Sequence, residues 1–215
     1  MTSDTSRFVA DDSQQYSTED TVLGAAFGGN GEYRHRRDGW PEPLYTDGKH
    51  YGWDHEKGEL TGAAFRSAWS ILGRNHAPFL LFDLYYLGGL DITTHPEVVA
   101  DAWSGAEFPS RALTRAMWVE LFNVAGYTSA GQPAEPPEQV TVWRGCTPGR
   151  RHGMSWTADR DKAQWFADRP GYASRGRVYV HRASGYELLA YISDRNESEY
   201  VIDPQYLAGG VVHPA

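Results

Sequence analysis

The sequence predicts no disulfide bond, no membrane span and no signal peptide. The chain of 215 residues contains one cysteine, Cys146, so no disulfide can form within it. Lone cysteines are typical of proteins made for a reducing compartment. Residues 1–7 lack the apolar stretch of a secretory signal, and no run reaches the eighteen or so apolar residues of a membrane helix. We therefore expect a cytoplasmic protein with no membrane partner.

Positive charge is also scarce in the first part of the chain. The net charge is −8; residues 1–137 carry 10 Lys and Arg against 19 Asp and Glu, and residues 138–215 carry 10 against 9. Strong non-specific nucleic-acid binding needs a basic face, which the first part does not provide. A local cluster of Arg144, Arg150, Arg151 and His152 could still hold a small dianion. No metal site is expected, because His50 and His55 have no nearby third ligand.

The apolar pattern changes its period along the chain. Helical spacing predicts one helix from about residue 60, a buried helix over 78–87 ended by Gly88, one begun by Thr94, and one capped by Ser110 that buries residues 113, 117, 121 and 124. Strand-like alternation follows at 140–144, 155–157, 176–181, 188–192 and 200–203, with one helix near 161–167 capped by Thr157. Helices first and strands later predict an α+β fold.

Composition divides the chain into four stretches. Residues 1–58 look irregular, 59–128 form a helical region, 129–137 read as a linker rich in Pro and Gly, and 138–215 form the sheet-containing core. We expect residues 58–215 to make one integrated domain.

Two glutamates near the C-terminus stand out. In an extended strand Glu197, Glu199 and Val201 would share one face, because side chains alternate. Neighbouring carboxylates are costly to shield from water. A solvated edge strand would explain them structurally, since charges on edges block aggregation. A catalytic site, in which one carboxylate acts on a sugar and the other on a nucleophile, would need both.

Three motifs in order carry a resemblance to a known family. One strand ends in Trp143-Arg144-Gly145, a second holds Ser155-Trp-Thr157 and leads into the helix with Phe166, and a last strand begins Glu197-Ser-Glu199. This pattern, over about residues 138–205, resembles the Arg-Ser-Glu class of mono-ADP-ribosyltransferases. The resemblance implies a small split β-sandwich as the core, with the N-terminal helices packed on it.

The resemblance also implies roles for these residues. Arg144 would bind the diphosphate of NAD, with Gly145 allowing close approach of the ligand, and Ser155 would orient the catalytic glutamate. Glu199 would stabilise positive charge on the ribose as nicotinamide leaves, and Glu197 would meet the acceptor.

The remaining members of the implied site lie around the helix. Thr157 and Phe166 would contact the cofactor, and Tyr172 could stack on nicotinamide or an acceptor. Strand alternation predicts Trp156 in the core. Helical position predicts that Trp165 and Phe166 are mostly core residues.

The expected function is therefore NAD-dependent transfer of ADP-ribose to a macromolecule, most plausibly a protein arginine. Family habit suggests a bacterial or phage effector or toxin, acting in a bacterial cell or phage-infected host. NAD hydrolysis, or transfer to nucleic acid, remains open within the enzyme class. A catalytically inactive module that binds ADP-ribose or a protein is the alternative outside it.

Overall fold

A computed structural model describes residues 39, 41, 44–46, 51–54, 56, 58–169, 176–194 and 197–215. Its helices are α2 (Gly62–Leu72), α3 (Ala77–Tyr86), α4 (Glu97–Gly105), α5 (Pro109–Ala112), α6 (Arg115–Ala125) and α7 (Arg160–Ala167). Its strands are β1 (Leu44–Thr46), β2 (Tyr51–Trp53), β3 (Thr128–Ser129), β4 (Gln132–Pro133), β5 (Gln139–Cys146), β6 (Ser155–Thr157), β7 (Arg177–Ser184), β8 (Leu188–Ile192), β9 (Glu199–Ile202) and β10 (His213–Pro214). The α+β class expected from the sequence is confirmed.

The main sheet is mostly antiparallel. Its described strands lie in the order β10-β7-β5-β6-β9-β8-β3-β4, and β3 pairs with β8 in parallel. The short hairpin β3–β4 falls partly within residues 129–137, which composition had suggested as a linker. That prediction is corrected, because backbone pairing at Ser129↔Tyr191 makes this stretch an edge of the sheet.

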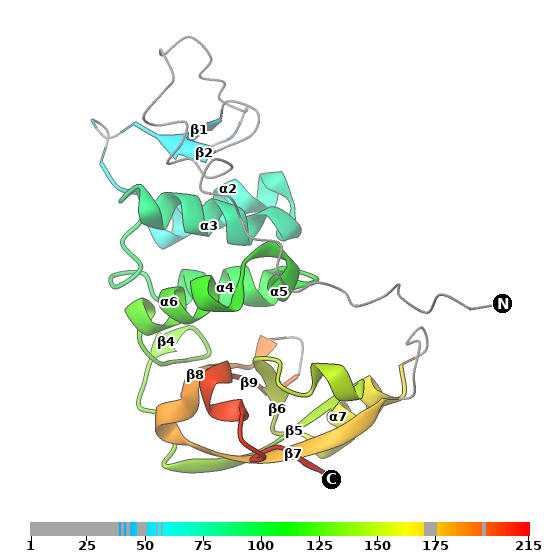
Figure 1. Ribbon diagram of the computed structural model, residues 1–215. Coiled ribbons are helices and arrows are strands. Elements are labelled where there is room, and N and C mark those ends of the chain that lie inside the picture. The colour runs from blue at the N-terminus through cyan, green and yellow to red at the C-terminus, as the bar shows by residue number, and fades with distance from the viewer. Residues whose placement is uncertain are drawn as a thin grey trace, which may run out of the picture.

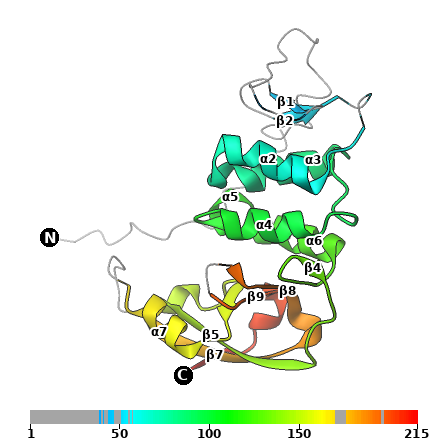
Figure 2. The same cartoon turned by 180° about the vertical axis from the view of Figure 1, so that it is seen from behind.

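The helices form layers over one face of the sheet (Figures 1 and 2). Hairpin β1–β2 lies farthest from the sheet, α2 and α3 come next, and α4 to α6 lie against the sheet. One apolar core runs through these layers into β8 and β9, where it includes Leu189, Ile192 and Val201. A second core fills the other face and includes Val142, Trp156 and Ile202. The buried position predicted for Trp156 is confirmed.

Helix α3 matches its prediction closely. Its residues are apolar on most sides, and seven of the ten are buried. Just after the helix ends, the backbone N–H of Gly89 donates to the carbonyl oxygen of Leu84 at 2.8 Å. Gly88 has a positive φ of 68°, which favours glycine. A helix that is apolar all round can only be stable between other layers, as it is here.

Helix starts were predicted less well. Helix α4 begins after Pro96, and the hydroxyl of Thr94 donates instead to Asp91. Ser110 lies inside the short helix α5, so it does not cap α6. The cap of α6 is Thr114, whose hydroxyl accepts from the backbone N–H of Met117.

The buried face of α6 also differs from the predicted one. Leu113 precedes the helix and Val124 is exposed, whereas Trp118, Leu121 and Phe122 are buried. The inward face is turned towards Trp118 and Phe122 because the ring of Trp103 on α4 packs against both.

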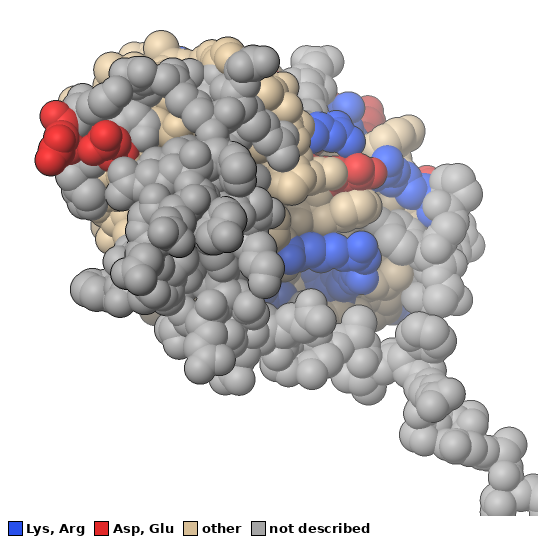
Figure 3. Space-filling view, turned by 90° about the horizontal axis from the view of Figure 1, so that it is seen from above, with Lys and Arg blue, Asp and Glu red and all other residues tan. Residues whose placement is uncertain are grey.

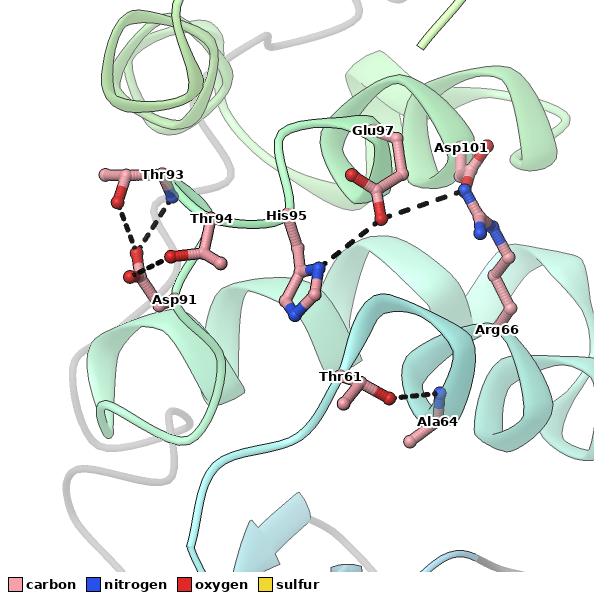
Figure 4. A network of polar contacts seen from close by, with 9 residues as sticks. All are labelled: Thr61, Ala64, Arg66, Asp91, Thr93, Thr94, His95, Glu97 and Asp101. Carbon is pink, nitrogen blue, oxygen red and sulfur yellow. Dashed lines mark hydrogen bonds and ion pairs between the residues drawn. The ribbon is translucent and has the colours of Figure 1, made fainter. Parts of the chain in front are cut away.

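Polar contacts join α2 to α4 and fix the position of α4 over the sheet (Figure 4). Arg66 on α2 contacts Asp101 at 2.5 Å and Glu97 at 4.0 Å, and His95 contacts Glu97 at 3.6 Å. Just before α4, hydrogen bonds from Thr94 and Thr93 lower the pKa of Asp91 to about 2. Such exposed contacts add little stability each, but together they define how α4 is seated.

Within the described residues, no helix combines the length and apolarity that crossing a membrane requires.

Candidate active site

The three motif strands lie side by side. Strand β6 pairs with β5 on one side and with β9 on the other, so Arg144, Ser155 and Glu199 come from adjacent strands. Ser155 is opposite Val201 and Thr157 is opposite Glu199. Directly opposed residues share a face, and Val201 belongs to the core beneath the helices. Ser155 and Glu199 therefore face the helical layer.

Glu199 is held by donors from two different layers. The indole Nε1 of Trp103, on α4, donates to Glu199 Oε1 at 2.9 Å, and the side chain of Ser155 provides a second hydrogen bond. The residue keeps some exposure to the cleft, but its carboxylate is surrounded by protein atoms. Two donors fix the rotamer of the carboxylate, as a reacting group requires.

The environment of Glu199 disfavours its charge. Burial raises the pKa of this carboxyl above its ordinary value of 4.5, and the charge of Glu197 raises it further. The hydrogen bonds from Ser155 and Trp103 and the charge of Arg144 lower the pKa and so act in the opposite direction. A carboxylate in such a balance is a candidate for chemistry, because perturbed groups concentrate at functional sites.

Glu197 does not lie in the strand, which corrects the prediction of a continuous Glu-x-Glu strand face. Strand β9 begins at Glu199, and Ser198 has a left-handed φ of 45° that breaks the alternation. Both glutamates nevertheless line the same cleft. A non-glycine residue in this region is strained, and such strain is often found at active sites.

The hydroxyl of Thr157 is engaged in hydrogen bonds within the protein. Its Oγ1 donates to the carbonyl of Glu197 at 2.6 Å and accepts from the N–H of Asp159. It does not cap α7, because Asp159 does so, accepting from Asp161 and Lys162. The predicted cap is corrected. Thr157 supports the site by tying the segment before Glu199 to β6.

Arg144 lies where β5 and β6 separate. The two strands share the single pair Trp143↔Thr157. The guanidinium of Arg144 donates to the carbonyls of Arg150 and Ser155 beyond that pair. These bonds fix the plane of the guanidinium, and a guanidinium has five N–H donors, so donors remain for a ligand. Gly153 makes the position possible, because a Cβ there would lie 2.4 Å from Arg144 Nη2.

Gly145 serves the packing of α7, and it also lines the cleft described below. A Cβ at Gly145 would lie 1.7 Å from the carbonyl oxygen of Ala163 and 2.6 Å from the nitrogen of Ala167. Helix α7 rests directly on the backbone of β5, and this contact sets where its aromatic residues emerge.

A cleft of about 1480 Å³ runs between the helical layer and the sheet. Its walls include Trp103, Arg144, Ser155, Glu197 and Glu199. Phe166 also lines it and is partly buried. Trp165 lines it too, but is 55 % exposed, so the prediction of a core position is wrong. Tyr172 lies outside the described residues.

Trp103 is the site residue that sequence reasoning missed. It precedes Glu199 by 96 positions and lies in the helical region, beyond the reach of the motif resemblance. Its ring packs edge-on against Trp118 and Phe122, with centroids 5.0 and 5.7 Å away. Nothing local distinguishes it among the eight tryptophans of the chain.

Comparison with protein-family models, with curated proteins and with solved structures finds no match to this chain. Among the described residues, no three His, Cys, Asp or Glu side chains are grouped so as to hold a metal ion. Cys146 is buried, and burial raises the pKa of its thiol, which disfavours the thiolate needed by a nucleophile. The polar groups that line the cleft are carboxylates, arginine side chains and hydroxyls such as that of Ser155.

Proposed function

We propose that this protein is an NAD-dependent mono-ADP-ribosyltransferase. The observation that carries the proposal is the Glu199 carboxylate, held by Trp103 and by Ser155 from the strand beside it, in a cleft that Arg144 also lines. The Arg-Ser-Glu order of motifs gave this expectation, and the adjacency of their strands supports it.

The reaction follows from the placement of the carboxylate. The bond between the nicotinamide nitrogen and ribose C1′ breaks, and its electron pair leaves with neutral nicotinamide. Positive charge then develops on the ribose, and the fixed carboxylate of Glu199 stabilises it. Preorganised charge of this kind is often the largest single contribution to catalysis. The raised pKa of Glu199 means that its ionised form is destabilised until the positive charge on the ribose pairs with it.

Glu197 and Arg144 would act on either side of this centre. Glu197 would accept the proton of the attacking group as that group donates its electron pair to C1′. Arg144 would use its remaining donors on the NAD diphosphate, for which a guanidinium is well suited. When water takes the acceptor position, the same steps amount to NAD hydrolysis. A protein arginine is the acceptor that the Glu-x-Glu motif suggests.

Release of nicotinamide from NAD tests the proposal. The purified protein is assayed alone and with bacterial lysate, beside Glu199→Gln and the matched control Glu135→Gln, whose residue is exposed in the loop after β4. We expect release that Glu199→Gln abolishes and Glu135→Gln leaves unchanged. NAD binding without release, by a folded protein, would reject the enzyme and favour the inactive binding module.

A further inference from the structure

The cleft is larger than its proposed cofactor needs. Small-molecule sites occupy about 300–1,000 Å³, whereas this cleft measures about 1480 Å³. It extends from the carboxylates past α5 on one side and α7 on the other. The cleft therefore has room for an acceptor beside the cofactor.

Each side of the cleft carries an exposed aromatic ring with a cation over it. Phe108, just before α5, is 53 % exposed and has the guanidinium of Arg111 4.6 Å from its ring centre. Trp165, on α7, is 55 % exposed and has the guanidinium of Arg169 at 4.7 Å. A single exposed ring is ordinary on a protein surface, but here both exposed rings line the same cleft.

The charge of the lining favours an anionic partner. Six arginines line the cleft, against four carboxylate residues, Glu107, Asp194, Glu197 and Glu199. Arg74 is paired with Glu107 at 3.1 Å. In contrast, Arg111, Arg150 and Arg169 are exposed and form no ion pair with any carboxylate of the described residues. Seen from above, Lys and Arg side chains gather on the side where α5 and α7 lie (Figure 3).

We infer that this cleft binds a single-stranded nucleic acid, which is the acceptor of the ADP-ribose. Unpaired bases can stack on Phe108 and Trp165 while Arg111, Arg150 and Arg169 neutralise phosphates, the combination used by single-strand binding proteins. Paired bases hide the faces that such stacking needs. A guanidinium acceptor would instead be repelled by the arginines along the cleft. The inference rests on the proposed function.

The transfer step balances with the groups already placed. A base amino group or a ribose hydroxyl of the nucleic acid donates an electron pair to C1′ of the NAD ribose as the bond between C1′ and nicotinamide breaks. The proton lost by that group passes to Glu197 and then to solvent. No oxidant, reductant or metal is required.

Binding is tested with a fluorescein-labelled 12-nucleotide single-stranded RNA of mixed sequence, followed by anisotropy. Neutralising three phosphates should weaken binding roughly 20-fold between 50 and 200 mM salt, from a slope of about −0.7 per contact. Arg111→Gln and Arg169→Gln should each flatten that slope, and Trp165→Ala should weaken binding roughly fivefold or more. The control Arg182→Gln changes an exposed arginine on β7, away from the cleft, and should have no effect.

Transfer is tested by incubating the same unlabelled RNA with radiolabelled NAD. Label on the RNA that requires Glu199 and decreases in Trp165→Ala would support the inference. An RNA that neither binds nor is labelled, while nicotinamide release still depends on Glu199, would overturn the inference and leave the proposed function intact; competition by free arginine would then test a protein acceptor. Binding of RNA without any nicotinamide release would reject the proposed function and, with it, the role of RNA as acceptor.

Discussion

Replacing Trp103 by phenylalanine removes one donor from Glu199 and keeps an aromatic ring in place. The lost contact is the hydrogen bond from Trp103 Nε1 to Glu199 Oε1 at 2.9 Å. Trp103 is 4 % exposed, so its indole N–H reaches Glu199 within the packed interior and its loss leaves that carboxylate oxygen without this donor. Phenylalanine can still contact Trp118 and Phe122, which limits the damage to the helical layer.

The size of the effect follows from the charge on the acceptor. A hydrogen bond to a charged group contributes about 1.5–3 kcal/mol. A loss of about 2 kcal/mol from the transition state corresponds to a decrease in kcat of about 30-fold. Because the Trp103 hydrogen bond lowers the pKa of Glu199, its removal should also raise that pKa further. The acidic limb of the pH–rate profile should therefore move to higher pH.

The assay is nicotinamide release as a function of pH, with Trp69→Phe as the matched control. Trp69 also belongs to the helical layer, but its Nε1 is buried and has no hydrogen-bond partner among the described residues. The control makes the same chemical change without removing a hydrogen bond, so it should leave both kcat and the profile nearly unchanged. Equal losses in the two variants with an unmoved acidic limb would refute a positioning role for Trp103.

Two further predictions concern stability and the arginine. Glu199→Gln should raise Tm by about 2–4 °C at pH 8, the shift for roughly 1 kcal/mol in a protein of this size. Because the pKa of Glu199 is raised in the folded state, the wild type loses stability as pH rises through that pKa. The Tm advantage of Glu199→Gln in thermal unfolding should therefore shrink towards pH 5. A Tm advantage that does not change with pH would contradict this. Gly153→Ala should displace Arg144 through overpacking and lower kcat/KM for NAD about tenfold. The control Gly149→Ala, whose added Cβ has nothing within 4 Å, should leave kcat/KM unchanged. Equal kinetics for the two variants would count against Arg144 as a ligand of NAD.

Features set by local pattern could be predicted from the sequence. Strands β6 and β8 have the bounds that alternation suggested, and the apolar run of α3 made its burial certain. Periodicity shows which residues face the core, and the bounds and burial of these elements depend on little else.

Other features depend on contacts between distant segments. The left-handed Ser198 and the exposure of Trp165 follow from how β9 and α7 meet their neighbours, which propensity does not describe. The cap of α7 was predicted at Thr157, but Asp159 provides it, and the hydroxyl of Thr157 is instead bonded to the carbonyl of Glu197 and the N–H of Asp159. Trp103 could not be assigned, because its partner is brought to it only by the packing of α4 on the sheet.

The division of the cleft between two layers has a consequence for dissecting this protein. A fragment of residues 138–215 would keep all three motif strands but would lose Trp103 and the edge hairpin β3–β4. It would also expose the apolar surface that Leu189, Ile192 and Val201 now share with the helices. A fragment chosen by the motifs alone would therefore contain the sheet without the helices that complete the cleft, and the boundary should lie upstream of α2, whose residues share the same apolar core.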